Sequence, residues 1–243
     1  MPNITTAMVM AAGHGTRMGA LTNNTCKALV RVGGKALIDH TLDRLDAFGV
    51  QRAIVNVHAF ADKLEAHLKA RKHGPKIIIS NERKTLLETG GGVVKALPLL
   101  GDDPVLICNI DAVWITFEPV LKNLITAWNP DIMDELFLLA NVRNALGFNG
   151  NGDFSMNAKG VLQKRTQASA PYIYAGIEIF KPSLAHGFEE KKFSRNVIWD
   201  KGLKRQKIFG HVMEAYWMHV GDPRAHLATQ AVIEQALKDQ AFL

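Results

Sequence analysis

The fold of this chain is decided by residues 7–18, which read AMVMAAGHGTRM, and by Lys27, which follows after a short loop. The apolar residues 7–12 predict a buried strand, and the glycines that follow predict a loop. Glycine lets the backbone approach a ligand closely and turn successive N–H groups towards it, which suits an anion. Arg17 and Lys27 add the positive charge that a polyphosphate requires. The stretch therefore predicts a nucleoside triphosphate site.

Two other phosphate-binding motifs contain similar glycines, and both fit this sequence poorly. The dinucleotide fingerprint G-x-G-x-x-G requires a glycine where this chain has Met18. The acidic residue expected after the second strand is also missing, because that strand ends in Asn-Val-His at 56–58. The Walker pattern fails because Leu29 stands where its first glycine belongs and Ala36 follows the Gly-Lys pair. We therefore expect neither motif.

Apolar runs and helical patterns alternate from residue 6 to about residue 128. After the first strand, the pattern predicts strands at 53–57, 76–80 and 104–109 and helices at 36–48, 62–72, 92–100 and 119–128. Shorter strand patterns follow at 135–140, 153–156, 161–166, 172–180 and within 203–213, before a helix at 224–237. We predict an α/β fold: a Rossmann-like three-layer α/β/α sandwich with a mostly parallel central sheet and a small β-rich substrate lobe.

The composition suits a protein that binds an anionic ligand in a reducing compartment. Lys and Arg number 29 against 23 Asp and Glu, a formal charge of +6. The basic run at 191–207 is expected to be a solvated helix face, and it has few interleaved aromatic residues, which disfavours nucleic acid as a partner. Cys26 and Cys108 give no disulfide framework, and no apolar run is long enough to span a membrane. We expect a cytoplasmic protein with no membrane partner.

A carboxylate, Asp111, follows the strand predicted at 104–109. In an open parallel sheet, ligands bind beyond the carboxyl ends of the strands. A carboxylate in that place can hold Mg²⁺, which typically takes one or two protein carboxylates together with phosphate oxygens and water. The structural alternative is an Asx turn at the end of the strand. Because the glycine loop follows a neighbouring strand, we predict a Mg²⁺ site at Asp111.

The motif MAAGxGxRM at 10–18, with Lys27, resembles the signature of the sugar-phosphate nucleotidylyltransferases, which join a nucleoside triphosphate to a sugar 1-phosphate. The proline that usually precedes the lysine is Cys26 here. Leu-Glu-Thr-Gly-Gly-Gly at 87–92 is similar to the narrower group of uridylyltransferases that act on N-acetylmuramate 1-phosphate, a cell-wall sugar. Further matches to that group are Asn109-x-Asp111, Gly152-Asp153-Phe154, Tyr174-Ala175-Gly176-Ile177 and Val220-Gly221.

The resemblance implies one domain over residues 1–243, with a nucleotide-binding half at about 1–128 and a sugar-binding lobe at about 129–243. Nucleotide contacts are expected from Ala11, Ala12, Gly13, Gly15, Thr16, Arg17, Lys27, Glu82, Thr89 and Gly90. Catalysis is expected from Arg17, Lys27 and Asp111, and sugar contacts from Asn109, Asp153, Gly176 and Glu178. Thr89 and the glycines beside it are expected in a loop that precedes the helix at 92–100.

The base is expected to be uracil, because by the resemblance Glu82 would accept its N3–H, whereas cytosine has no proton there. An exposed loop acid is the structural alternative for Glu82. The substrates are then UTP and a sugar 1-phosphate, most simply N-acetylmuramate 1-phosphate. Two alternatives stay open: transfer of guanylyl, thymidylyl or cytidylyl groups to another sugar phosphate or to phosphocholine, and a nucleotide-sensing relative without turnover.

The second metal ligand is where this chain departs from the family pattern. The family presents an aspartate near its C-terminus, and residues 216–223, YWMHVGDP, place His219 there. Imidazole is a poor ligand for Mg²⁺ and a better one for Mn²⁺. Three arrangements are therefore expected: His219 binds the metal, Asp222 replaces it, or water completes the coordination of Asp111.

Overall fold

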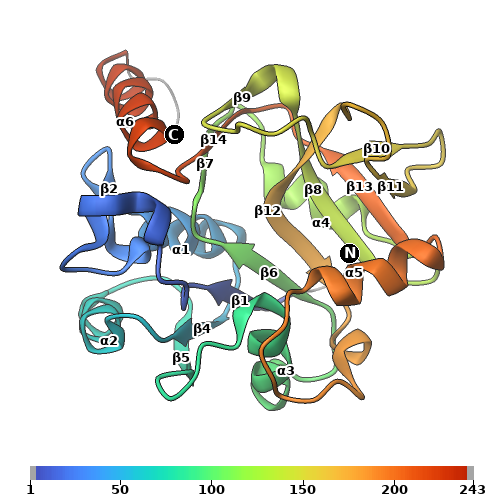
Figure 1. Ribbon diagram of the computed structural model, residues 1–243, viewed down its shortest axis with the longest axis horizontal. Coiled ribbons are helices and arrows are strands. Elements are labelled where there is room, and N and C mark those ends of the chain that lie inside the picture. The colour runs from blue at the N-terminus through green and yellow to red at the C-terminus, as the bar shows by residue number, and fades with distance from the viewer. Residues whose placement is uncertain (1–3, 240–243) are drawn as a thin grey trace.

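The computed structural model describes residues 4–239 and is organised around a nine-stranded sheet (Figure 1). Its main strand order is β11-β10-β12-β6-β1-β4-β5, and β8 pairs with both β12 and β13. The strands are β1 (Thr6–Met10), β4 (Arg52–Val57), β5 (Lys76–Asn81), β6 (Val105–Asn109), β8 (Glu135–Asn141), β10 (Phe154–Met156), β11 (Leu162–Lys164), β12 (Tyr172–Phe180) and β13 (Ile208–Val212). Strands β6, β1, β4 and β5 are parallel to one another, and β12 joins β6 antiparallel.

Helices cover both faces of this sheet because its central strands are apolar on both sides. The helices are α1 (Leu37–Phe48), α2 (Ala61–Ala70), α3 (Glu88–Leu100), α4 (Val120–Ala127), α5 (Asn196–Lys204) and α6 (Pro223–Lys238). In β1, Val9 packs in one core with α1 and α2, and Met8 packs in a second core with α3. Successive side chains of a strand point to opposite faces, so one short strand serves both cores. The predicted fold class is confirmed.

A small second sheet crosses the carboxyl end of β6, and the sequence patterns did not predict it. Its strands are β7 (Ala112–Ile115), β14 (Tyr216–His219) and β9 (Ala145–Leu146), in the order β7-β14-β9. The antiparallel register of β7 and β14 sets His219 opposite Ala112. The Val220 N–H also donates to the Asp111 carbonyl at 2.8 Å. The pairing therefore brings the C-terminal part of the chain to the end of β6.

A two-stranded ribbon, β2 (Arg31–Val32) with β3 (Lys35–Ala36), precedes α1.

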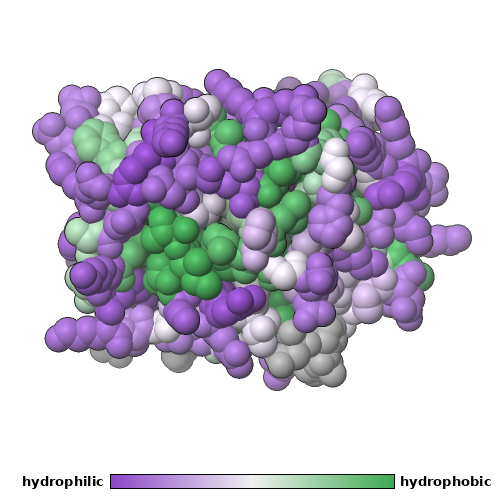
Figure 2. Space-filling view, turned by 90° about the horizontal axis from the view of Figure 1, so that it is seen from below, coloured by the Kyte–Doolittle hydropathy of each residue, from purple (hydrophilic) through white to green (hydrophobic). Residues whose placement is uncertain are grey.

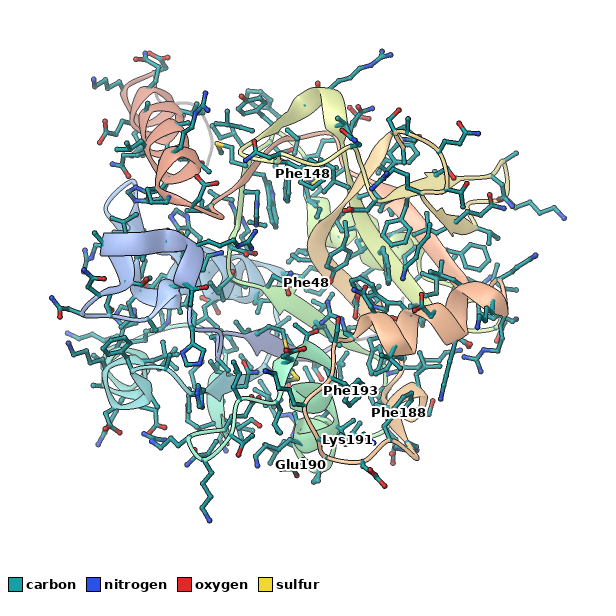
Figure 3. The ribbon with its side chains drawn as sticks, viewed as in Figure 1. Phe48, Phe148, Phe188, Glu190, Lys191 and Phe193 are labelled. Atoms are coloured by element: carbon teal, nitrogen blue, oxygen red, sulfur yellow. The ribbon has the colours of Figure 1, made fainter. Side chains whose placement is uncertain are left out.

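The glycines at 90–92 lie in the first turns of α3, so the predicted loop before this helix is wrong. Helix α3 begins at Glu88 rather than at Gly92, and residues 191–195 pack directly against it. A Cβ on Gly91 would lie 2.0 Å from the Lys191 carbonyl oxygen, and one on Gly90 would lie 2.4 Å from the ring of Phe193. Figure 3 labels Lys191 and Phe193 beside α3. Gly90 and Gly91 are therefore needed for close packing between α3 and this segment.

The basic run at 191–207 is only partly the solvated helix face that the sequence predicts. Lys201 and Lys204 lie on the exposed side of α5, but the Arg195 side chain is 3% exposed. Its Nε lies 3.1 Å from Oε1 of Glu178, and Nη2 donates to the Tyr174 hydroxyl at 2.9 Å. A buried guanidinium is stable only when carboxylates or other acceptors surround it, and here β12 supplies them.

A second buried carboxyl, that of Glu135, belongs to the same cluster. Burial raises the pKa of Glu178 to about 7, and burial together with the neighbouring charge of Glu178 raises that of Glu135 well above its usual range. Both side chains are 0% exposed. Two acids share one guanidinium, so ionising both would leave an unpaired buried charge. The cluster therefore retains a proton near neutral pH.

Stability should consequently fall as the pH rises through this range. A carboxyl whose folded-state pKa is raised stabilises the fold fully below its unfolded value of 4.5, and that contribution is lost as the pH rises through about 7. Glu135→Gln removes one of the two titrating carboxyl groups of the cluster, because an amide stays neutral as the pH changes. We expect the variant to be more stable than the parent at pH 8, and by a clearly smaller margin at pH 5, because burial and the charge of Glu178 raise the pKa of Glu135. Denaturant unfolding at both values measures this, with Glu214→Gln on the surface as the control. A difference independent of pH would contradict it.

The surface is mostly hydrophilic, and the face shown in Figure 2 carries one large apolar area together with smaller ones. Strand β5 is the edge of the sheet on that side, and its Ile77, Ile78 and Ile79 are half-buried. Among the described residues, no helix has the length and apolar character that crossing a membrane requires.

Candidate active site

Two cavities open where β1 and β6 end, and they meet at a shared set of residues. The loop cavity, of about 610 Å³, lies over the glycine loop that follows β1. The lobe cavity, of about 540 Å³, lies between the end of β6 and the strands β10, β11 and β12. Arg17, Asn109 and Asp111 line both. The glycine loop and Asp111 therefore lie together at one edge of the sheet, as predicted.

The glycine loop presents unused N–H groups to the loop cavity. Gly15 has φ +66°, and a Cβ there would lie 2.8 Å from Cβ of Lys27, so glycine is required on both counts. Within residues 4–239, the N–H groups of Gly13, His14 and Gly15 make no hydrogen bond. Arg17 is exposed at the cavity wall and makes no ion pair with any described residue. Consecutive unpaired N–H groups beside an arginine form a site for an anion.

The N–H groups of Ala11 and Ala12 are used inside the protein instead. They donate to Oδ1 of Asn56 at 2.6 and 3.2 Å. Nδ2 of Asn56 donates in turn to Oε1 of Glu82 at 2.8 Å, and Oε2 of Glu82 accepts the Leu87 N–H at 3.1 Å. Both alanines line the cavity, but Glu82 is only 1% exposed and lies beneath it. The structure therefore corrects the expectation for Glu82: the side chain holds Asn56, and through it the loop, rather than a base.

The sequence analysis overlooked Asn56 as a functional residue. It is the one polar side chain in the core run of β4, Ala-Ile-Val-Asn-Val, and it is 2% exposed. A buried amide must find partners for its donors and acceptors. A polar residue interrupting an otherwise apolar buried strand was the available signal.

Lys27 and His219 converge on one oxygen of Asp111. Nζ of Lys27 lies 2.7 Å from Oδ2 of Asp111, and Nε2 of His219 lies 3.4 Å from the same atom. Burial alone would raise the pKa of Asp111, but the hydrogen bond from His219 and the charge of Lys27 hold it well below its usual range. The carboxylate is therefore ionised at the boundary between the two cavities.

The chemistry at Asp111 suits a divalent cation that keeps most of its coordination for other ligands. Among residues 4–239, no group of three or more His, Cys, Asp or Glu side chains could hold a metal ion. An ion at Asp111 would therefore take phosphate oxygens and water as its remaining ligands, as Mg²⁺ commonly does. Asp222 lines neither cavity, since its carboxylate caps α6 by accepting the Ala225 N–H at 2.8 Å. The geometry thus favours His219 over Asp222 as the neighbour of Asp111.

The lobe cavity has aromatic walls and a polar floor. Phe148, labelled in Figure 3, and Trp217 pack edge to face, with ring centroids 6.4 Å apart. The remaining lining residues are Ala112, Gly152, Asp153, Phe154, Lys164, Arg165, Ile173, Tyr174, Gly176, Asn196, Trp199 and His219, besides the three that both cavities share. The aromatic residues offer apolar surface, and the amides and charged groups offer polar contacts, the combination that sugars require. Asp153 and Gly176 were predicted from the sequence, but the aromatic residues of this cavity were not.

Besides Glu82, two further predicted contacts, Glu178 and Gly90, lie outside the cavities. Glu178 belongs to the buried cluster with Arg195, so the structure corrects its expected role as a sugar contact. The Gly90 N–H donates to the Phe193 carbonyl at 2.9 Å rather than facing a ligand. Thr89 lines the loop cavity, and its Oγ1 accepts the Arg195 N–H at 2.9 Å.

The segment 194–196 joins the two cavities. Ser194 lines the loop cavity and Asn196 lines the lobe cavity. Arg195 between them is anchored below by Glu178 and Tyr174. This buried arginine therefore fixes the wall that both cavities share.

Residues 7–136 match the model of the MobA-like NTP transferase domain. The chain belongs to this family. Over 235 residues it is 46% identical to an N-acetylmuramate alpha-1-phosphate uridylyltransferase of Caulobacter vibrioides, covering 95% of this chain and 97% of that protein. A second protein of that name, from Neisseria meningitidis, is 31% identical over 88% of this chain and 92% of its own length. The resemblance read from the sequence is confirmed.

The fold comparison agrees with the family. A UDP-glucose pyrophosphorylase solved with UDP-glucose superposes with a TM-score of 0.78 at 14% identity, covering 96% of this chain and 99% of that one. At that identity the likeness concerns the fold alone. The family match and the two curated relatives make this chain an enzyme of the sugar-phosphate nucleotidyltransferase class, which generally uses a divalent metal.

Proposed function

We propose that this enzyme transfers the uridylyl group of UTP to N-acetylmuramate 1-phosphate, releasing pyrophosphate and a UDP-sugar. The observation that carries the proposal is the meeting of two cavities at the Lys27–Asp111 pair, with a phosphate-binding loop on one side and an aromatic-walled cavity on the other. A reaction between two phosphate-bearing substrates needs such a shared boundary. The names of the two curated relatives supply the base and the sugar.

The loop cavity would hold the nucleotide, and the lobe cavity the sugar. The free N–H groups at 13–15, with Thr16 and Arg17, would bind the β- and γ-phosphates, which leave as pyrophosphate. Asn109, Asp153 and Gly176 would contact the sugar. These assignments support the division of one domain, residues 1–243, into a nucleotide-binding half at about 1–128 and a sugar-binding lobe at about 129–243.

The reaction needs positioning and positive charge rather than a general base. The phosphate oxygen of the sugar 1-phosphate is already a competent nucleophile and would attack the α-phosphorus of UTP in line with the departing pyrophosphate. Lys27 lies where the two cavities meet and would neutralise charge on the phosphoryl group in transfer. Arg17 would stabilise the leaving pyrophosphate.

Asp111, with His219 beside it, would hold Mg²⁺ between the two substrates. The bound ion would supply charge neutralisation between the approaching phosphates. Mn²⁺ remains the alternative if His219 coordinates directly, because nitrogen ligands favour it. We further place the enzyme in the cytoplasm, in keeping with its two buried, unpaired cysteines.

The choice of metal tests the role of His219. If its imidazole is a ligand, Mn²⁺ should support higher activity than Mg²⁺ at equal free concentration, and His219→Asp should shift the preference towards Mg²⁺. The ratio of the two rates at pH 8 measures this in both proteins. An unchanged ratio would show that water completes the coordination of Asp111 instead. His186→Asp, at an exposed histidine outside both cavities, is the control for a new carboxylate.

Pyrophosphate release tests the proposed function. The enzyme is incubated with Mg²⁺, UTP and a panel of N-acetylmuramate, N-acetylglucosamine, glucose and mannose 1-phosphates, with phosphocholine as a further acceptor. We expect the highest kcat/KM with N-acetylmuramate 1-phosphate. Release with GTP, CTP or dTTP but not with UTP would contradict the uridylyl assignment. A failure to release pyrophosphate with any of the acceptors would indicate a nucleotide-binding protein without turnover.

A further inference from the structure

Arg165, which directly follows β11, lines the lobe cavity in a fixed position. Its Nε donates to the Gly152 carbonyl at 2.9 Å, and its Nη1 to the Gln167 carbonyl at 3.3 Å. Its backbone N–H donates to the Asp153 carbonyl at 2.8 Å. Three hydrogen bonds to main-chain oxygens therefore hold this exposed residue, and its Nη2 makes no hydrogen bond with the described residues.

The loop that holds Arg165 is itself tightly packed. Gly152 has φ +81°, and a Cβ there would lie 2.0 Å from the Ala170 carbonyl oxygen. The Ala170 N–H also donates to the Asn151 carbonyl at 2.7 Å. These contacts fix the Gly152 carbonyl that receives Nε. The guanidinium is consequently pre-organised before any substrate arrives.

Arg165 forms no ion pair with a carboxylate in the described part of the chain. The nearby Asp153 is close enough for the charge of Arg165 to lower its pKa, but it does not reach ion-pair distance. The carboxylate of Asp153 instead accepts the Tyr174 N–H at 3.0 Å. The neighbouring cation of the same cavity, Lys164, is already paired with Asp200. Arg165 is therefore a positively charged side chain in the cavity wall that has no ion-pair partner among the described residues.

That anion is not the 1-phosphate. The phosphates are expected where the two cavities meet, at Arg17, Lys27 and Asp111, beside the ends of β1 and β6. Strands β10 and β12 stand between β6 and β11, the strand that leads into Arg165 (Figure 1). A sugar anchored by its phosphate at the boundary would thus extend its ring towards Arg165. A second acidic group on the ring would meet the guanidinium there.

We propose that Arg165 binds a carboxylate on the sugar ring and so selects an acidic sugar 1-phosphate over its uncharged counterpart. The inference rests on the proposed function and assigns a residue to its substrate choice. N-acetylmuramate carries a lactyl ether that ends in a carboxylate, and N-acetylglucosamine has a hydroxyl in its place. A pre-organised guanidinium pairs with a carboxylate through two parallel hydrogen bonds, but with a hydroxyl through only one weaker bond.

The test compares these two sugar 1-phosphates with UTP in the parent enzyme and in Arg165→Gln. We expect the parent to prefer N-acetylmuramate 1-phosphate by about 10- to 100-fold in kcat/KM, the range of a hydrogen-bonded charge pair. Arg165→Gln should reduce the preference to within about threefold, mainly by raising KM for the acidic sugar. Arg165→Lys should keep part of it, because charge remains but the paired geometry is lost. Lys159→Gln, which makes the same charge change on the exposed turn before β11, should keep all of it.

Calorimetric binding of the two sugar phosphates to each protein gives a readout that does not depend on turnover. Equal affinities in the parent, or an unchanged preference in Arg165→Gln, would overturn the role of Arg165. If the parent turns over both sugar 1-phosphates equally well, this inference fails, whereas uridylyl transfer to a sugar 1-phosphate stands. If the parent binds the acidic sugar through Arg165 but releases no pyrophosphate, the proposed function fails instead.

Discussion

Replacing Lys27 by alanine should lower kcat for uridylyl transfer by roughly 10²–10³-fold. Nζ of Lys27 is 2.7 Å from Asp111, and the side chain is only 12% exposed, so its charge acts where little water screens it. The charge is needed mainly while the phosphoryl group passes between oxygens. The loss should therefore appear in kcat far more than in KM for UTP.

The result is informative only if the Lys27→Ala protein is folded and keeps its normal thermal stability. Lys27 begins a short 3-10 turn between buried Cys26 and Ala28, and alanine fits that turn without strain. Lys159→Ala, outside both cavities, removes the same charge and should keep full activity. Parent rates from a folded Lys27→Ala protein would remove Lys27 from the mechanism.

Asp111→Asn should reduce metal-dependent activity by at least about 10²–10³-fold. An amide binds divalent cations far more weakly than a carboxylate does, and the substitution keeps the size of the side chain. It also leaves Lys27 and His219 without the carboxylate that both contact. The concentration of Mg²⁺ that gives half of the remaining rate should rise, and a titration of rate against free Mg²⁺ measures it.

Asp39→Asn is a useful comparison, because Asp39 is a partly buried carboxylate that pairs with His67 and Arg71 away from both cavities. It should cost stability without changing the Mg²⁺ titration. An Asp111→Asn protein with an unchanged titration and an unchanged rate would place the metal elsewhere.

The part of the site that the sequence predicted comes from local patterns. The strand at 6–10, the glycines after it and the carboxylate after the strand at 105–109 are each readable in a few consecutive residues. Parallel strands place their carboxyl ends at one edge, so the loop and Asp111 had to meet there. No longer-range information was required for that conclusion.

The approach of His219 to Asp111 depends on the pairing of β7 with β14, two strands of four residues each that lie far apart in the sequence. Nothing in either short strand specifies its partner or its register. The resemblance placed His219 at the family's aspartate position, but only the pairing explains how it reaches the site.

The two glutamates were misplaced for a different reason. Glu82 and Glu178 are 1% and 0% exposed, and an acidic residue in a sequence is normally expected at the surface or in a site. Their partners, Asn56 and Arg195, lie on other elements, so neither burial nor pairing could be read locally. The same holds for Gly90 and Gly91 of α3, which pack against Phe193 and Lys191.

The most direct test of the central claim is the identity of the product formed in competition. The enzyme is supplied with Mg²⁺, N-acetylmuramate 1-phosphate and equal concentrations of UTP, CTP, GTP and dTTP, and the nucleotide sugars are identified by mass. We predict that the UDP-sugar predominates, with one pyrophosphate released for each molecule formed. A different nucleotide sugar as the main product, or pyrophosphate release without any nucleotide sugar, would contradict the account.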